Sequence, residues 1–270
     1  MCCCGFFAPP PHGRLVPLDE AEPYNRGNPY IHTGYRVRYD LKLTLRSLLF
    51  LHNEWANVWT HLSALIGFFF LMFYAYSTWL ADGSFSDKAM FLVWVISAQT
   101  LLFSSSFFHL TECMGPKVWL IGVRMDYTSI SVLIVGSYFP MIHYLFACHS
   151  GWQYFYIGLM LALGVLVKPE FQALRASLYV AMGLFGALCA PHVYILSSSE
   201  ELAGLMPGGT YIVGAYIYAT KIPEKWFPGK FDYWWHSHMI WHIFVVAATM
   251  WHYSAVYHAH EWRTNFPCAS

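Results

Sequence analysis

The chain has 270 residues, of which 57% are hydrophobic and 19% aromatic but only 11% are charged. Soluble domains have about 25% charged residues, so this composition excludes disorder and most soluble folds. The 15 basic and 15 acidic residues cancel with the histidines neutral, which excludes a basic surface for nucleic acid. Seven cysteines do not indicate a disulfide scaffold. The 14 histidines are an excess, because an imidazole in lipid is costly without a partner.

Two segments are predicted ahead of the first apolar run. Residues 1–40 contain several prolines and are expected to form a flexible cytoplasmic arm. In residues 41–54, leucines alternate with Lys42 and Arg46 in a stretch too short to cross a bilayer. This pattern predicts an amphipathic helix on the inner leaflet with its basic side chains toward anionic lipid. The opening cysteines are either S-acylated or unmodified reduced thiols; they are Cys2, Cys3 and Cys4.

Seven apolar runs follow, each close to the ~17–25 residues that a bilayer-crossing helix needs. The first begins too far along the chain for a cleavable signal peptide. Residues 55–257 are therefore predicted as an all-α domain of seven transmembrane helices, followed by a short extracytoplasmic tail at 258–270. The runs are roughly 55–80, 88–110, 125–147, 152–168, 174–197, 202–220 and 236–257.

Basic residues predict the orientation, because short cytoplasmic loops collect Lys and Arg. With the amino terminus inside, 13 of the 15 basic residues, among them Lys168, lie on the cytoplasmic side, and Lys88 and Arg263 lie outside. Losing or adding one helix would scramble this alternation. The carboxyl terminus is therefore predicted to be outside. Cys148 and Cys268 then both fall on the oxidising side, and the sequence does not decide whether they pair.

Two histidines stand four residues apart in the seventh run, in Ser237-His238-Met239-Ile240-Trp241-His242. At about 100° and 1.5 Å per residue, a helix brings them to one face about a turn apart. The HExxH motif of metalloproteases supplies two zinc ligands in this way. In a soluble helix this spacing is weak evidence, but two unpaired imidazoles in a membrane helix favour a function.

Other polar groups fall at the same depth. The second run ends just after His109, with Ser105 one turn earlier, and the third begins just before Asp126. Three imidazoles with an open position are typical of a catalytic zinc site, whereas structural sites usually have four protein ligands. We therefore expect zinc on His109, His238 and His242, with Asp126 either as the fourth ligand or as the base that orients a water.

The remaining histidines are expected in structural or solvated positions. Near the outer end, interfacial or solvated positions are expected for His143, His149, His252, His258 and His260, and His192 is too distant to be a ligand. His12, His32 and His52 lie on the arm, and His236 is expected to be solvated at the membrane edge. His61 is at the depth of the site, but helix-packing hydrogen bonds are the expected role of Asn57, Thr60 and His61.

Several motifs together resemble a known family over residues 28–257. They are Asn53-Glu54 through Trp59-Thr60-His61, Ser105-x-x-x-His109, Asp126-Tyr127, the loop from Lys221 to Asp232, and Ser237-His238-x-x-x-His242. In these motifs the sequence resembles the progestin and adipoQ receptor family, which includes the adiponectin receptors and the hemolysin III-type proteins.

The resemblance implies seven helices with the amino terminus inside and a zinc ion near the inner leaflet. Carried over, the zinc ligands are His109, His238 and His242, with Asp126 beside a zinc-bound water and Ser105 near it. Family members that act as lipid hydrolases resemble alkaline ceramidases in their metal site. Asn28-Pro29-Tyr30 and Trp251-His252 are similar to both a Golgi-resident branch that tethers signalling kinases and the adiponectin-receptor branch, so both plasma membrane and Golgi membrane are retained as locations.

The first functional hypothesis is a receptor-like membrane protein that hydrolyses the ceramide amide to a sphingoid base and a fatty acid. An apolar cavity among the helices would receive the lipid, ceramide or free fatty acid. Asp126 would take and return the proton, and Ser105 would steady the water or the oxyanion.

The second hypothesis is a non-enzymatic signalling or anchoring receptor in which zinc is structural. Its arm and the Lys221–Lys230 loop would bind a cytoplasmic partner, and an extracellular ligand is a further candidate partner. A transporter is disfavoured because the polar cluster does not continue outward. A purely structural alternative, packed helices with histidines satisfied by Ser and Asp, leaves the shared depth of the histidines unexplained.

Overall fold

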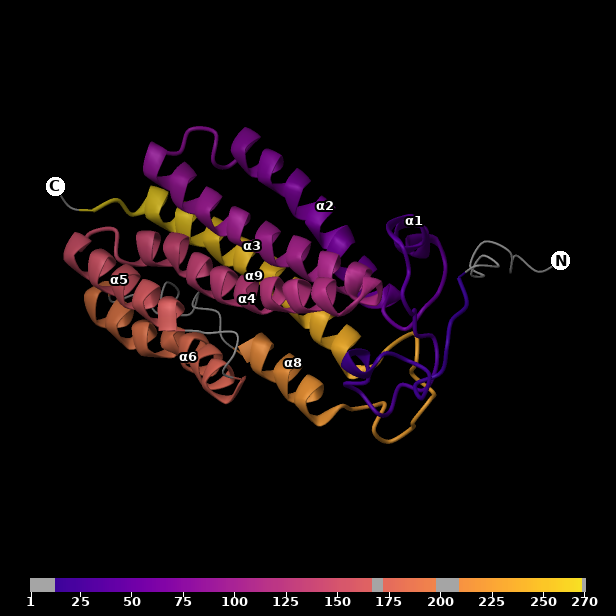
Figure 1. Cartoon of the computed structure of the whole chain (residues 1–270). Helices are drawn as coiled ribbons and strands as arrows, with labels where there is room; N and C mark the ends of the chain where they lie inside the picture. Colours follow the sequence, from indigo (N-terminus) through magenta and orange to yellow (C-terminus); the bar gives the residue numbers. More distant parts are fainter. Residues whose placement is uncertain (1–12, 167–171, 198–208, 269–270) are drawn as a thin grey trace. The chain divides into compact units, whose positions relative to one another are not determined.

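The computed structural model describes residues 13–166, 172–197 and 209–268. These residues form helices joined by turns, with no β-strand among them and one isolated antiparallel bridge between Val16 and Tyr35. The α-helices are α1 (Leu41–Arg46), α2 (Trp55–Ser77), α3 (Phe85–Thr111), α4 (Pro116–Leu145), α5 (Ser150–Leu166), α6 (Gln172–Ser197), α8 (Gly209–Thr220) and α9 (Ser237–Asn265) (Figure 1). The short 3-10 turns are η1 (Pro23–Asn25), η2 (Ser47–Leu49) and η3 (Glu112–Met114). The all-α prediction is confirmed.

Five helical segments of the described chain are long and apolar enough to cross a membrane. They are Trp55–Ser77, Phe85–Met114, Pro116–Leu145, Leu178–Leu196 and Ser237–Asn265. The helix α5 is also apolar but has only 17 residues. These segments are those of a multi-pass membrane protein. The predicted span 202–220 begins outside the described residues, where Lys168, Cys2, Cys3 and Cys4 also lie.

Two helices are longer than the sequence predicted. The helix α4 begins at Pro116 rather than near residue 125, because proline suits the first turn of a helix and Gly115, with φ of 144°, ends the preceding turn. The helix α9 continues to Asn265, past the predicted end at 257. In its last turn Arg263 donates hydrogen bonds to the backbone carbonyls of Tyr144 and Phe266, which helps to satisfy this end of the helix.

The amphipathic helix predicted over 41–54 is shorter in the structure. Asp40 caps α1 by accepting a 2.7 Å hydrogen bond from the Leu43 backbone N–H. The α-helix ends at Arg46, η2 follows, and residues 50–54 are not helical. Leucines on this segment are exposed in the structure, as a membrane-facing surface requires; they are Leu41, Leu45 and Leu49.

The described helices are divided between two compact units. Unit 1 contains Met1–Leu65, Leu102–Asp126 and Val213–Val246. Unit 2 contains Ile66–Leu101, Tyr127–Ile212 and Ala247–Ser270. Unit 1 therefore includes the beginning of α2. It also includes the end of α3 and the beginning of α9, where the predicted ligand residues lie.

In unit 1 the arm packs against the loop between α8 and α9. The Asp232 carboxylate accepts hydrogen bonds from the His32 backbone N–H at 2.9 Å and the Thr33 hydroxyl at 2.6 Å. Glu224 is fully buried and accepts a hydrogen bond from Asn28 at 3.0 Å. The prolines predicted a flexible arm, but residues 13–40 make these long-range hydrogen bonds. We call residues 13–54 and 221–236 together the arm–loop cap.

Unit 2 packs around aromatic rings. Trp94 is fully buried, and its ring centroid lies 5.5 Å from Phe91 and 5.1 Å from His252. The prediction of an interfacial or solvated His252 is wrong, because aromatic packing leaves that residue 4% exposed. His143 is half-buried and lies 3.0 Å from a carboxylate oxygen of Asp87.

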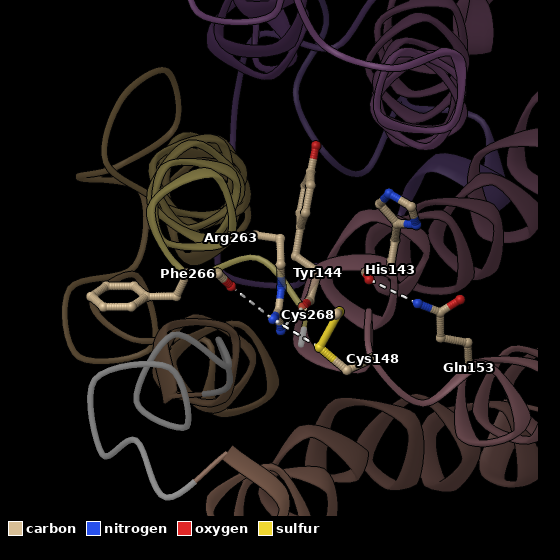
Figure 2. Close-up of a disulfide and its surroundings, with 7 residues drawn as sticks. All are labelled: His143, Tyr144, Cys148, Gln153, Arg263, Phe266 and Cys268. Carbon is tan, nitrogen blue, oxygen red and sulfur yellow. Dashed lines mark hydrogen bonds between the residues drawn. A yellow bond between two sulfur atoms is a disulfide. The ribbon is translucent and has the colours of Figure 1, made fainter. Parts of the chain in front are cut away.

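A disulfide joins Cys148 to Cys268 in unit 2, which settles the pairing that the sequence left open (Figure 2). It ties the turn after α4 to the segment that follows α9, across a sequence separation of 120. Arg263 lies beside it and donates a hydrogen bond to the Cys148 sulfur as well as to the Tyr144 carbonyl (Figure 2). The carboxyl-terminal end of α9 is therefore held both covalently and by hydrogen bonds.

Candidate metal centre

Three histidines converge in unit 1. His109 comes from the last turns of α3, and His238 and His242 come from the first two turns of α9. One ring nitrogen from each lies within 4.8 Å of the others. The ring centroids are 4.8 Å apart for His109 and His238, and 4.9 Å for each other pair. The structure thus brings together the three residues that the sequence predicted as ligands.

Hydrogen bonds at the Nδ1 atoms make the cluster suitable for a metal. His109 Nδ1 lies 2.8 Å from a Glu54 carboxylate oxygen, and His242 Nδ1 lies 3.1 Å from the Asn57 carbonyl oxygen. Neither acceptor has a proton to give, so both Nδ1 atoms are N–H donors and each Nε2 atom keeps its lone pair. Among the described residues, the buried Nε2 of His109 has no hydrogen-bond partner. Imidazole nitrogens in this arrangement are typical zinc ligands.

Ser105 and Asp126 form a pair beside the cluster. Both are buried, on α3 and α4, and the Ser105 hydroxyl hydrogen-bonds to the Asp126 carboxyl. Asp126 also interacts electrostatically with His109. Ser105 therefore has a defined partner, and its contact with Asp126 suits it to orienting that carboxyl group.

Glu54 was not singled out from the sequence as a site residue. It directly precedes α2, and its carboxylate accepts hydrogen bonds from Asn57 at 2.6 Å and from Asn53 at 3.2 Å, in addition to the contact with His109. Burial opposes ionisation of Glu54, but the hydrogen bond to His109 and the nearby imidazoles lower the pKa of this carboxyl below its usual value. Glu54 could have been identified from the sequence, because it lies one helical turn before Asn57 within a motif that carries the family resemblance.

A second set of possible ligands shares His109. One atom each from Glu54, His109 and Glu112 lie within 4.8 Å of one another. Glu112 follows α3 in η3 and is 8% exposed. Glu112 was not among the site residues expected from the sequence.

His61 lies against the cluster, beyond the packing role predicted for it. Its ring is stacked on that of His242, with centroids 3.8 Å apart and planes 6° apart. Thr60 also reaches the cluster, since its hydroxyl oxygen lies 3.2 Å from His242 Nδ1. Two neighbouring residues of α2, Thr60 and His61, therefore both contact the predicted ligand His242.

The arm–loop cap holds the helix ends that present the histidines. Arg36 is 2% exposed and donates hydrogen bonds to the carbonyls of His109 at 2.6 Å and Leu110 at 2.9 Å. At the start of α9, Glu224 accepts hydrogen bonds from the backbone N–H and the hydroxyl of Ser237. A cation at a helix C-terminus and an acid at an N-terminus are both stabilising.

Two other histidine predictions have different outcomes. His236 was expected to be solvated but is 4% exposed, and its Nδ1 accepts a hydrogen bond from the Met239 backbone N–H at the start of α9. Burial lowers the pKa of His236. In unit 2, His192 lies 2.7 Å from the Tyr156 hydroxyl and packs against Trp152, which is a structural role.

The fold and the site together define a multi-pass helical membrane protein with a histidine cluster in which His109 and His242 are buried and His238 is partly buried. The family model described as haemolysin-III related matches residues 49–253, and the chain belongs to this family.

Three curated relatives illustrate the similarity. An adiponectin receptor protein from Drosophila melanogaster is 33% identical over 85% of this chain and 56% of its own length. Heptahelical transmembrane protein 1 of Arabidopsis thaliana is 31% identical, over 94% of this chain and 83% of its own length. Progestin and adipoQ receptor-like protein 1 of Caenorhabditis elegans is 32% identical, over 94% and 63%. The chain thus spans little more than half of the Drosophila protein.

Proposed function

We propose that this protein is a receptor-like zinc hydrolase that cleaves the amide bond of ceramide. The observation that supports this most directly is the convergence of three histidine nitrogens. Two of the rings, those of His109 and His242, donate from Nδ1 and so keep the Nε2 lone pair for a metal. Catalytic zinc sites usually have three protein ligands and an open position, and three histidines are one such set. When bound, zinc supplies Lewis-acid chemistry, polarising a carbonyl and making water acidic enough to react near neutral pH.

The chain's own residues account for the proton transfers of such a reaction. In amide hydrolysis water adds its oxygen to the carbonyl carbon, the C–N bond breaks and the nitrogen gains a proton. The Asp126 carboxylate would accept the proton from the attacking water and return it to the leaving nitrogen. Ser105, hydrogen-bonded to Asp126, would fix the direction of that carboxylate.

Ceramide is proposed because the site lies among apolar helices. The histidines lie on helices that are apolar enough to cross a membrane. A lipid with an internal amide would therefore reach them from the bilayer more readily than a soluble amide would from water. Free fatty acid would then be a product bound in the same place. Plasma membrane and Golgi membrane both supply such lipids, and an extracellular ligand would act on this site from a distance.

A non-enzymatic anchoring function is the second candidate, favoured by the arm–loop cap. The cap is held by buried acids and presents exposed aromatic side chains to a cytoplasmic partner; they include Trp226 and Phe227. In that case zinc would hold α3 and α9 together without turnover.

The test is zinc content per chain, by mass spectrometry, together with fatty-acid release from ceramide. We expect one zinc in the native chain, loss of zinc and release in His238→Ala, and retained zinc with strongly reduced release in Asp126→Asn. Zinc without turnover of any ceramide would favour the anchoring function. Full release by Asp126→Asn would remove Asp126 from the reaction, and a native chain without zinc would overturn the proposal.

A further inference from the structure

The residues around the start of α2 contact two of the three histidines from outside the cluster. One Glu54 oxygen lies 2.8 Å from His109 Nδ1 and also accepts a hydrogen bond from Asn57 at 2.6 Å. The other Glu54 oxygen accepts a hydrogen bond from Asn53 at 3.2 Å. Hydrogen bonds from Asn57 and Asn53 thus fix both oxygens of the carboxylate that contacts His109.

His242 is held by the same segment. Its Nδ1 lies 3.1 Å from the Asn57 carbonyl oxygen and 3.2 Å from the Thr60 hydroxyl oxygen, and the Thr60 hydroxyl itself donates to the Asn57 carbonyl at 3.0 Å. The face of the ring is covered by His61. The ring of His242 is therefore fixed in the plane by its Nδ1 contacts and across the plane by stacking.

We propose that Glu54–His61 is a positioning segment for the metal, with Glu54 and Thr60 as its positioning residues. By keeping the Nδ1 protons of His109 and His242 occupied, it directs both Nε2 lone pairs toward one point. This inference rests on the proposed zinc site. Residues that orient ligand histidines in this way typically affect metal affinity by about 10–100-fold.

The alternative is that Glu54 is itself a ligand, with His109 and Glu112. The distance of 2.8 Å between His109 Nδ1 and Glu54 is that of a charge-assisted hydrogen bond. The same Glu54 oxygen already accepts a hydrogen bond from the side chain of Asn57. Both contacts favour Glu54 as a partner of His109 over Glu54 as a ligand.

The experiment measures zinc affinity of the purified full chain by competition with a chelator, and the visible spectrum of the Co²⁺-substituted protein. Glu54→Gln keeps the size of the side chain but removes the charge that holds the His109 proton. We expect it to bind one zinc at saturation with an affinity about 10–100-fold lower and a shifted cobalt spectrum. The matched control is Asp87→Asn, which alters an acid of unit 2 that lies 3.0 Å from a different histidine, His143, and should leave both readouts unchanged.

Two substitutions at Thr60 separate the role of its hydroxyl from that of its methyl group. Thr60→Val removes the hydroxyl next to His242, while Thr60→Ser keeps it, so only the valine variant should weaken zinc binding. The expected loss is smaller than for Glu54→Gln, because the Asn57 carbonyl still accepts from His242.

Three results would overturn the inference. Native zinc affinity and cobalt spectrum in both Glu54→Gln and Thr60→Val would show that the segment does not position the ligands. Loss of the bound zinc in Glu112→Gln, with retention in His238→Ala, would place the metal at the second set and overturn the proposed function as well. A native chain that binds no zinc would overturn both, whereas native zinc with unaffected variants would overturn the positioning role alone.

Discussion

Unit 1 buries charged and hydrogen-bonding side chains, whereas unit 2 buries aromatic rings and is cross-linked by a disulfide. Of the 24 buried polar residues in the described chain, 19 belong to unit 1 and five to unit 2. The buried acids of this set are all in unit 1; they are Glu112, Asp126, Glu224 and Asp232. Because burying a charge is unfavourable unless it is paired, unit 1 accepts a cost that unit 2 avoids.

The positions of the buried charges show what that cost supports. Arg36 and Glu224 bond to the ends of the helices that present His109 and His238, and Glu54 bonds to His109 itself. Removing one member of such a network leaves its partner buried and unsatisfied, which is strongly destabilising. The two units should therefore respond to different perturbations, unit 1 to the loss of a charge and unit 2 to the loss of its disulfide.

The largest effect on unit 2 is expected from Cys268→Ser. The disulfide closes a sequence separation of 120, and closing a loop of this length stabilises a soluble chain by up to about 5 kcal/mol. We expect a lower thermal midpoint in detergent and faster hydrogen exchange in the unit 2 peptides around residue 148 and the end of α9, with zinc content unchanged.

The matched control for the disulfide is Cys189→Ser, which alters a buried free cysteine of the same unit without breaking a cross-link. If Cys268→Ser speeds exchange equally around His109, the assignment of the disulfide to unit 2 stability alone is wrong.

Arg36→Met should have the next largest effect, and it should fall on unit 1. The substitution leaves the His109 carbonyl, the Leu110 carbonyl and the Ser47 hydroxyl without their donor. Loss of a buried charged hydrogen-bonding partner typically costs about 2–3 kcal/mol. Hydrogen exchange should accelerate at the end of α3, and zinc should be released to a chelator at a lower concentration.

Arg38→Met is the comparison variant for Arg36, because Arg38 makes an exposed ion pair with Glu22. Water and salt screen exposed ion pairs, so they contribute little to stability, and this variant should resemble the native chain. Equal effects of the two arginine variants would contradict the role given to burial.

The sequence predicted the helical fold and the pairing of His238 with His242 because both depend on short-range patterns, and it predicted that His109 lies near them from its depth along a span. Apolar runs of the right length predict helices, and the spacing of His238 and His242 places them on one face. The residues that hold those ligands were harder to identify. Glu54 and Arg36 act from segments outside the long helices, through contacts that depend on how the chain returns to the end of α3, and no local period encodes such a return.

Helix ends were also difficult to predict, since a helix begins where its caps are satisfied. The start of α4 depends on Gly115 and Pro116. The end of α9 depends on hydrogen bonds from Arg263 to Tyr144 and Cys148, which are distant in the sequence. His236 was expected to be solvated and His252 interfacial or solvated because of their positions along a span, but packing around each residue buries both.

The long-range contacts of each unit also restrict which helices cross the membrane. Cys148 and Cys268 share a disulfide and so lie on one side, which requires an even number of crossings between them. The arm–loop cap requires an even number between residues 54 and 221. Since the five long segments already satisfy both conditions, α5 and α8 must either both cross or both remain uncrossed. We expect both to cross, which gives seven spans.

Labelling with a membrane-impermeant thiol reagent tests this count. In sealed vesicles of one orientation, a cysteine in place of Lys168 should react from the same side as one in place of Lys225 if α5 and α8 cross. Labelling of the two positions from opposite sides would reduce the number of spans to five. Single substitutions at these lysines should leave zinc content unchanged.

The smallest effect is expected at α1, which we propose lies on the anionic inner leaflet. Its leucines are exposed, and Lys42 and Arg46 stand on the same short helix. Each basic residue near an anionic surface contributes about 1 kcal/mol, so the charge reversal Lys42→Glu with Arg46→Glu should reduce retention of phosphatidylserine by the purified chain several-fold. The charge-conserving exchange Lys42→Arg with Arg46→Lys is the control and should retain native amounts. Because α1 lies in unit 1 outside the helix ends that hold the histidines, zinc affinity should not change. A charge reversal that lowered zinc affinity while leaving lipid retention intact would mean that α1 supports the metal centre instead of the membrane contact.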